Sequence, residues 1–121
     1  MTDITLFHNP RCSKSRETLA LLEQQGVSVT VVEYLKNPPS VEQLHWLVEK
    51  LGFDSPRQLM RTKEVEYKEQ SLDDSTLTEN QLLQAMVTTP KLIERPIAIN
   101  GERVALGRPP ENVLAIIDMR G

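Results

Sequence analysis

Apolar and polar positions follow two different periods along the chain, and the first third predicts a strand, a helix and a strand. Residues 4–7 are mostly apolar and predict a short first strand, which ends before an Asn-Pro pair. Apolar positions at helical spacing predict a helix over 13–25, with Gly26 as its C-terminal stop. β-Branched residues alternate over 27–32 and predict a second strand. So short a strand–helix–strand unit indicates a parallel pair joined by a right-handed crossover.

The middle of the chain keeps the helical period. Three helical segments are predicted over 41–51, 56–60 and 79–87, each directly after a residue that can cap it: Ser40, Ser55 and Thr78. Residues 62–77 are polar, and we expect a partly helical surface stretch there. His45 and Trp46 are interpreted as surface and packing positions of the first of these helices.

After Pro96 the period changes back to that of strands. Residues 96–100 and 103–106 predict two short strands around Asn100-Gly101, a two-residue hairpin signal, and 111–119 predicts a last helix. The order indicates an α/β protein with one four-stranded mixed sheet and helices on both faces. We expect a single domain over 1–121 with a thioredoxin-like fold and a helical insertion at about 41–95.

Composition and charge narrow the class of protein. The 121 residues are 39% hydrophobic and 26% charged, which is typical of a soluble globular domain. A net charge of −3 argues against non-specific nucleic-acid binding. No apolar run is long enough for a membrane span, and the N-terminus does not resemble a signal peptide. With a single cysteine, we expect the reducing cytoplasm. Because no long exposed apolar stripe is evident, we expect a monomer.

The one cysteine, Cys12, lies where the first predicted helix begins. Unpaired backbone N–H groups and the helix dipole favour a thiolate at such a position. The surrounding side chains could help, because the two nearby serines can donate hydrogen bonds and the basic groups add positive charge. These neighbours are His8, Arg11, Ser13, Lys14, Ser15 and Arg16. The alternatives are a small buried cysteine with no chemical role and a histidine that merely ends a strand.

Two familiar cysteine motifs and a metal site do not fit. A phosphatase loop places Arg six positions after its Cys, and here Thr18 stands there. A dithiol oxidoreductase needs a second Cys where Ser15 stands, so an oxidised Cys12 would need a thiol from another molecule. One Cys and two His give no familiar spacing of metal ligands, and we expect neither a metal nor a bound cofactor.

Three arginines could form an anion site near the cysteine. Arg95 precedes the first hairpin strand and Arg108 follows the second, so the hairpin brings them together. They would lie beside Cys12 if the first hairpin strand runs antiparallel to residues 4–7. Arg61 could reach the same place from the insertion. Clustered guanidinium groups bind tetrahedral oxyanions, although any one of the three could be an ordinary surface residue.

Several segments together resemble a known family. HNPRCSKSRETL, YLKNPPS, LGFDSPRQLMRTKE, AMVTTPKLIERPI and LGRPPE resemble the glutaredoxin-coupled arsenate reductases of the thioredoxin-like superfamily. The resemblance implies that Cys12 is the nucleophile, tuned by His8 and Ser15. It implies that Arg61, Arg95 and Arg108 bind the oxyanion, and that Arg95-Pro96 is a cis peptide. It also implies arsenate as substrate, glutathione as cosubstrate and glutaredoxin as partner.

Two other functions stay open. Related thioredoxin-like regulators bind RNA polymerase in response to thiol stress, but they typically carry Cys-x-x-Cys, and Ser15 counts against this reading. The chain could also be a thiol-dependent reductase of another small substrate.

Overall fold

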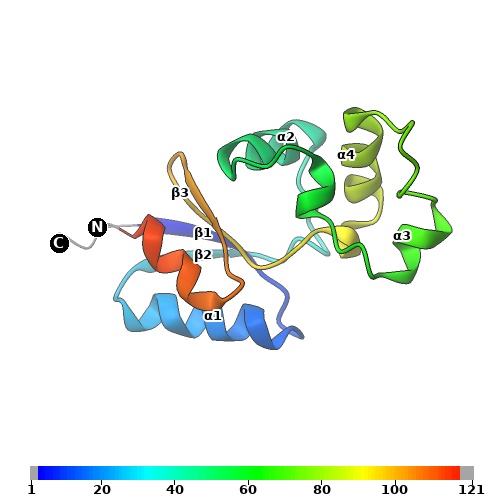
Figure 1. Cartoon of the computed structure of the whole chain (residues 1–121). Coiled ribbons are helices and arrows are strands. Elements are labelled where there is room, and N and C mark those ends of the chain that lie inside the picture. Colours follow the sequence, from blue (N-terminus) through cyan, green and yellow to red (C-terminus); the bar gives the residue numbers. More distant parts are fainter. Residues whose placement is uncertain (1–2, 118–121) are drawn as a thin grey trace. The chain divides into compact units, whose positions relative to one another are not determined.

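The computed structural model describes residues 3–117 of the chain, and these residues form two compact units (Figure 1). The first unit comprises Met1–Asn37 and Arg95–Gly121, and the second comprises Pro38–Glu94. The second unit covers nearly the range in which the sequence predicts a helical insertion. Within residues 3–117, no helix is long and apolar enough to cross a membrane.

The first unit is built on a four-stranded mixed sheet with the strand order β2-β1-β3-β4. The strands are β1 (Asp3–Phe7), β2 (Ser28–Val32), β3 (Ile97–Asn100) and β4 (Arg103–Leu106). β1 pairs in parallel with β2, whereas β3 pairs antiparallel with both β1 and β4. The predicted mixed sheet is confirmed, and so is the parallel strand–helix–strand unit at its start.

Two helical elements cover one face of this sheet. These are α1 (Ser13–Gln24) and the 3₁₀ helix η3 (Pro110–Ile116). Alternate residues of β1, Ile4 and Leu6, point into a cluster with Leu22 of α1 and Val113 of η3, and all four are fully buried. Successive side chains of a strand point to opposite faces, so this spacing of two fixes which face of the sheet α1 covers. The core therefore holds α1 and η3 against this face of β1.

The last helix and the hairpin turn differ from the prediction. An α-helix was expected over 111–119, but the chain forms a 3₁₀ helix that ends at Ile116, and positions 118–119 lie outside the described residues. Two consecutive prolines at its start remove backbone donors, which suits a short 3₁₀ turn. In the hairpin, Asn100 pairs with Arg103, which confirms the predicted strand ends at 100 and 103, but the turn residues are Gly101 and its successor and not the Asn100-Gly101 pair. Gly101 has φ +63°, and type II′ hairpins favour glycine at the first turn position.

The second unit is helical. Its elements are α2 (Val41–Lys50), η1 (Pro56–Leu59), α3 (Val65–Glu69), α4 (Glu79–Thr88) and η2 (Pro90–Leu92). The expected capping residues act as predicted: the side chains of Ser40, Ser55 and Thr78 accept backbone hydrogen bonds at the starts of α2, η1 and α4. The polar stretch 62–77 is partly helical through α3, as expected. The chain also forms an isolated antiparallel bridge between Met60 and Ile93.

Candidate active site

The loop between β1 and α1 is held by the backbone and side chain of Asn9. The Asn9 carbonyl oxygen accepts the Cys12 N–H at 3.0 Å, and its side-chain oxygen accepts the Arg11 N–H at 3.0 Å. The Asn9 N–H in turn donates to the Ser15 hydroxyl oxygen at 3.0 Å. Asn9 is a positioning residue that the sequence reading did not single out. The available signal was an Asn directly before a Pro at a strand end, where Asx turns are common.

Cys12 is the N-cap residue of α1, as the sequence predicted. Only 8% of the surface of Cys12 is exposed. Burial raises the pKa of the thiol, but the Ser15 backbone N–H donates a hydrogen bond that lowers it. The charge and a hydrogen bond of Arg95 lower it further, and the Lys14 backbone N–H adds to this. The net pKa of Cys12 lies below its ordinary value. The sulfur is therefore covered, yet its immediate partners favour the thiolate.

The partners of the sulfur differ in kind from those expected. The sequence suggested hydroxyl donors, but the Ser15 hydroxyl bonds His8 Nδ1 at 2.8 Å and the Asn9 N–H, and Ser15 reaches the sulfur with its backbone. Lys14 likewise contributes its backbone N–H. Helix geometry explains the difference, because the first N–H groups of a helix converge on the N-cap while the Ser15 side chain points into the buried interior. The positive charge that lowers the pKa of Cys12 comes from Arg95.

His8 follows β1 directly and is buried, with 6% of its surface exposed. Burial lowers the pKa of His8, Glu33 raises it and Arg16 lowers it, and the net direction is downward. The imidazole is therefore neutral at neutral pH, and a neutral ring can accept the Ser15 O–H at Nδ1. His8 thus orders Ser15 beside the sulfur and adds no positive charge to the site in this state.

The two ends of the β3–β4 hairpin meet beside the end of β1. Phe7 pairs with Ile97, which makes the first hairpin strand antiparallel to β1, as is required for the hairpin ends to lie beside Cys12. Ile97 also pairs with Leu106, and the Gly107 N–H donates to the Pro96 carbonyl oxygen at 2.9 Å. The Arg95–Pro96 and Arg108–Pro109 peptide bonds are both cis, and only the first was expected.

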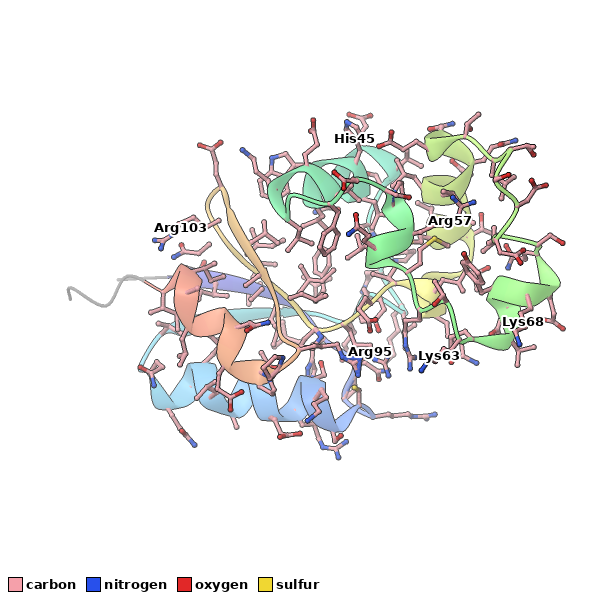
Figure 2. The ribbon with its side chains drawn as sticks, in the orientation of Figure 1. His45, Arg57, Lys63, Lys68, Arg95 and Arg103 are labelled. Atoms are coloured by element: carbon pink, nitrogen blue, oxygen red, sulfur yellow. The ribbon has the colours of Figure 1, made fainter. Side chains whose placement is uncertain are left out.

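Arg95 comes from the start of this hairpin and lies against the start of α1 (Figure 2). The residue is only 9% exposed. Its guanidinium lowers the pKa of Cys12 through its charge and a hydrogen bond, while its Nε and Nη1 are buried without a hydrogen-bond partner among residues 3–117. Buried donors that lack a partner are costly, so these N–H groups are suited to an oxygen-bearing anion. A thiolate beside such donors can attack the central atom of a bound oxyanion.

Arg108 follows Gly107 at the other end of the hairpin and is exposed. Its backbone is fixed, because its N–H donates to the Leu106 carbonyl and its carbonyl accepts from Asn112 Nδ2 at 3.0 Å. The hairpin thus brings the backbone of Arg108 to the same edge as Pro96, as predicted.

Gly107 allows α1 and the hairpin end to approach closely. A Cβ atom at this position would lie 2.7 Å from Thr18 Oγ1 and 2.8 Å from Pro96 Cγ. The Thr18 hydroxyl is itself fixed by donating to the Lys14 carbonyl at 2.8 Å. No sequence signal identified this contact, since a single Gly before Arg-Pro-Pro reads as a turn. It matters because it sets the spacing between α1 and the hairpin end next to Arg95.

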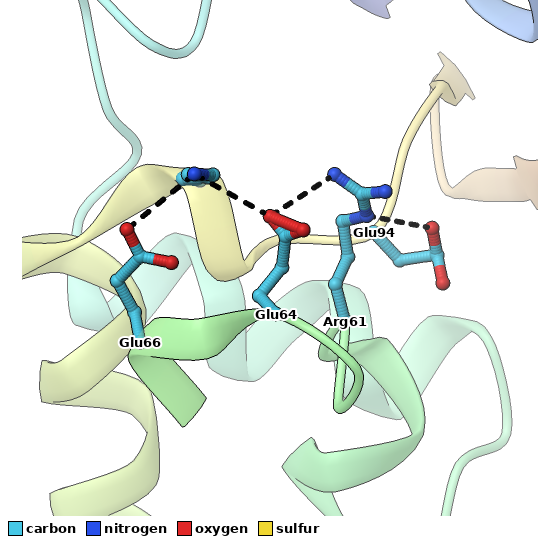
Figure 3. Close-up of polar contacts among 5 residues, drawn as sticks. Arg61, Glu64, Glu66 and Glu94 are labelled. Carbon is cyan, nitrogen blue, oxygen red and sulfur yellow. Dashed lines mark hydrogen bonds and ion pairs between the residues drawn. The ribbon is translucent and has the colours of Figure 1, made fainter. Parts of the chain in front are cut away.

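Arg61, the third predicted arginine, lies in the second unit in a network of ion pairs (Figure 3). Its Nη1 is 3.6 Å from Glu64 Oε2 and its Nε is 3.9 Å from Glu94 Oε1. Lys91 extends the network, with Nζ 3.7 Å from Glu64 and 3.4 Å from Glu66. The backbone of Arg61 is fixed by an N–H donated to the Leu92 carbonyl at 2.7 Å. Two carboxylates therefore offset the charge of Arg61, which the sequence did not predict.

The described part of the chain contains no candidate metal site. Within residues 3–117, no group of three or more His, Cys, Asp or Glu side chains is placed to hold a metal ion.

Known proteins match this chain over nearly its whole length. The family model described as ArsC family matches residues 7–116. A Haemophilus influenzae protein named arsenate reductase is 48% identical over 114 residues, which is 94% of this chain and 98% of that protein. The Escherichia coli K12 protein YfgD is 53% identical over 94% of this chain and 96% of its own length. The solved structure of arsenate reductase from Vibrio cholerae is 51% identical, with a TM-score of 0.94, and the match covers 96% of this chain and 98% of that one.

Proposed function

This chain belongs to the ArsC family, and we propose that it is an oxidoreductase that reduces arsenate to arsenite. The relatives named arsenate reductase support the substrate, since they match over nearly their whole length. The observation that carries the proposal is the pairing of Cys12 with Arg95: a thiol with a lowered pKa touches a buried guanidinium that has unpaired donors.

The first step is a displacement at arsenic. The Cys12 thiolate forms a bond to the As(V) atom, and one arsenate oxygen leaves with protons as water. The Nε and Nη1 groups of Arg95 hold the remaining oxygens and offset their charge. We assign the same anion-binding role to Arg61 and Arg108, on the strength of the family resemblance. His8 and Ser15 keep the loop around the sulfur ordered.

Reduction requires two electrons from outside the chain. Cys12 is the only cysteine, so no internal thiol can form a disulfide with it. We propose that glutathione displaces a second arsenic-bound oxygen of the Cys12 adduct, which leaves as water, and that a glutaredoxin thiolate then attacks the glutathione sulfur. The two thiols leave as a mixed disulfide, and As(V) becomes As(III). Water cleaves the remaining sulfur–arsenic bond, which releases arsenite and restores the Cys12 thiol. This cycle needs reduced thiols, so we propose that the protein acts in the cytoplasm. We also propose that it is a monomer, whose Cys12 adduct a glutaredoxin can approach.

The test is arsenite formation from arsenate with glutathione and glutaredoxin present. Wild-type protein should turn over, whereas Cys12→Ser should show no more than the reaction without protein. Omitting glutaredoxin should stop turnover after the adduct, which tests the electron donor separately from the substrate. Arsenite production equal to that of Cys12→Ser would refute the proposal. Glutathione bound to Cys12 without any arsenite would indicate a thiol-dependent reductase of another small substrate instead.

A further inference from the structure

The second unit contains a groove between α2 and α4 that takes no part in the chemistry of Cys12. It has a volume of about 560 Å³. Apolar side chains from both helices line it, with Val41 and Trp46 on α2 and Leu83 on α4. Trp46 is partly exposed, and it is the only tryptophan of the chain. A partly exposed indole in a groove is the kind of anchor that contributes most to protein–protein affinity.

The edge of this groove is acidic. Glu42 and Glu49 of α2 and Glu79 of α4 line it, and all three are exposed. The basic groups near them are His45, which also lines the groove, and Lys50 at the end of α2. Three carboxylates thus lie on the rim beside His45 and Lys50, so the groove attracts positive charge.

Two basic side chains of the chain itself already contact the carboxylates and the indole of the groove. The His45 ring lies between two carboxylates, with Nε2 3.6 Å from Glu49 and Nδ1 3.5 Å from Glu79. Lys50 Nζ lies 6.0 Å from the centroid of the Trp46 ring, within the range of a cation–π contact. The carboxylates and the indole thus already lie next to the nearest groups that can carry positive charge.

We propose that this groove binds a basic, partly apolar segment of a partner protein. An apolar side chain of the segment fits against Val41, Trp46 and Leu83, and flanking Lys or Arg residues pair with the glutamates. A groove between two helices with an exposed rim suits a peptide segment that lies along it. The rim charges steer the partner and select its sign, while the apolar centre supplies most of the affinity. This inference does not depend on arsenate reduction.

Trp46 reports on the groove directly, because no other tryptophan contributes to the fluorescence. Full-length protein is titrated with three synthetic peptides that lack tryptophan. The first is composed of Lys and Leu (the Lys/Leu peptide), the second of Lys and Ser (the Lys/Ser peptide), and the third of Glu and Leu (the Glu/Leu peptide). The Lys/Leu peptide should give a saturable change in Trp46 fluorescence that weakens as salt is raised. The Lys/Ser peptide should bind more weakly, and the Glu/Leu peptide should not bind. No saturable change with the Lys/Leu peptide, or equal binding of the Glu/Leu peptide, would overturn the proposal.

A matched pair of double variants separates the groove from general attraction to an acidic protein. Glu49→Gln with Glu79→Gln removes two rim charges and should weaken the Lys/Leu peptide by roughly threefold to tenfold. Glu23→Gln with Glu111→Gln removes two exposed charges of the first unit and should leave the affinity unchanged. All four positions are exposed, and far-UV circular dichroism checks that each variant is folded. Equal weakening by both double variants would contradict a site in the groove.

Discussion

The guanidinium of Arg95 lowers the pKa of the Cys12 thiol through its charge and a hydrogen bond, although the two residues come from the two separate stretches of sequence that make up the first unit. Cys12 is placed by the start of α1 and Arg95 by the start of the β3–β4 hairpin. The antiparallel pairing of Phe7 with Ile97 brings these two starts to one edge of the sheet. The activation of the thiol therefore depends on the sheet as much as on the helix.

Replacing Arg95 with Gln should raise the pKa of Cys12, because it removes the charge that stabilises the thiolate. A lowered pKa means that the thiolate is present above that pKa and is lost as pH falls through it. The midpoint of alkylation rate against pH should therefore move to higher pH in Arg95→Gln, with slower alkylation at neutral pH. Arg16→Gln serves as the control, since Arg16 is exposed and bonds the Pro10 carbonyl. Identical profiles for Arg95→Gln and wild type would rule out this assignment.

Replacing Ser15 with Ala should destabilise the fold while the Cys12 thiol stays acidic. The lost hydroxyl leaves His8 Nδ1 and the Asn9 N–H without their partner, at a cost of about 1–3 kcal/mol in the free energy of unfolding. The Ser15 contact with the sulfur is a backbone hydrogen bond and survives the substitution. Urea denaturation measures the loss, and Ser13→Ala is the exposed control. A thiol pKa restored to its ordinary value would mean that the hydroxyl is the important donor after all.

Replacing Gly107 with Ala should force α1 and the hairpin end apart. The new methyl group would lie too close to Thr18 Oγ1 and Pro96 Cγ, and such overpacking typically costs about 1–3 kcal/mol. Combining it with Thr18→Ala removes one of the clashing atoms. The double variant should then lose less stability than the sum of the two single variants. Strict additivity in denaturation experiments would show that the two positions do not contact each other.

Replacing Thr78 with Ala should destabilise the second unit through the start of α4. The Thr78 hydroxyl accepts the Gln81 N–H at 3.1 Å, and the Gln81 side chain accepts the Thr78 N–H at 2.8 Å. Losing such a cap costs about 0.5–2 kcal/mol in the free energy of unfolding. Thr78→Ser keeps the hydroxyl and should restore most of the stability. Thr88→Ala, at the exposed last residue of α4, should have a smaller effect than Thr78→Ala.

Local sequence signals located most elements because those signals act over a few residues. Ser40, Ser55 and Thr78 cap helices through bonds to residues two or three positions away, so their roles could be read directly. The misplaced hairpin turn and the overlong last helix show where this reading fails. At Asn100-Gly101 two registers differ by one residue, and the strand pairing decides between them. At Pro110 the helical period was clear, but the type of helix was not.

The sequence by itself determined the position of Cys12 at a helix start, the order of strands and helices, and the types of residue available to bind an anion. Each follows from the period of apolar side chains or from the backbone near one residue. Only the tertiary structure decided that Arg95 supplies the charge at the sulfur, that the Ser15 hydroxyl serves His8, and that Gly107 must lack a side chain. It also placed two carboxylates against Arg61. Some of these relationships join residues that are distant in the chain, and others depend on the direction of a side chain. Packing and hydrogen bonding within each folded unit determine which residues meet and where their side chains point.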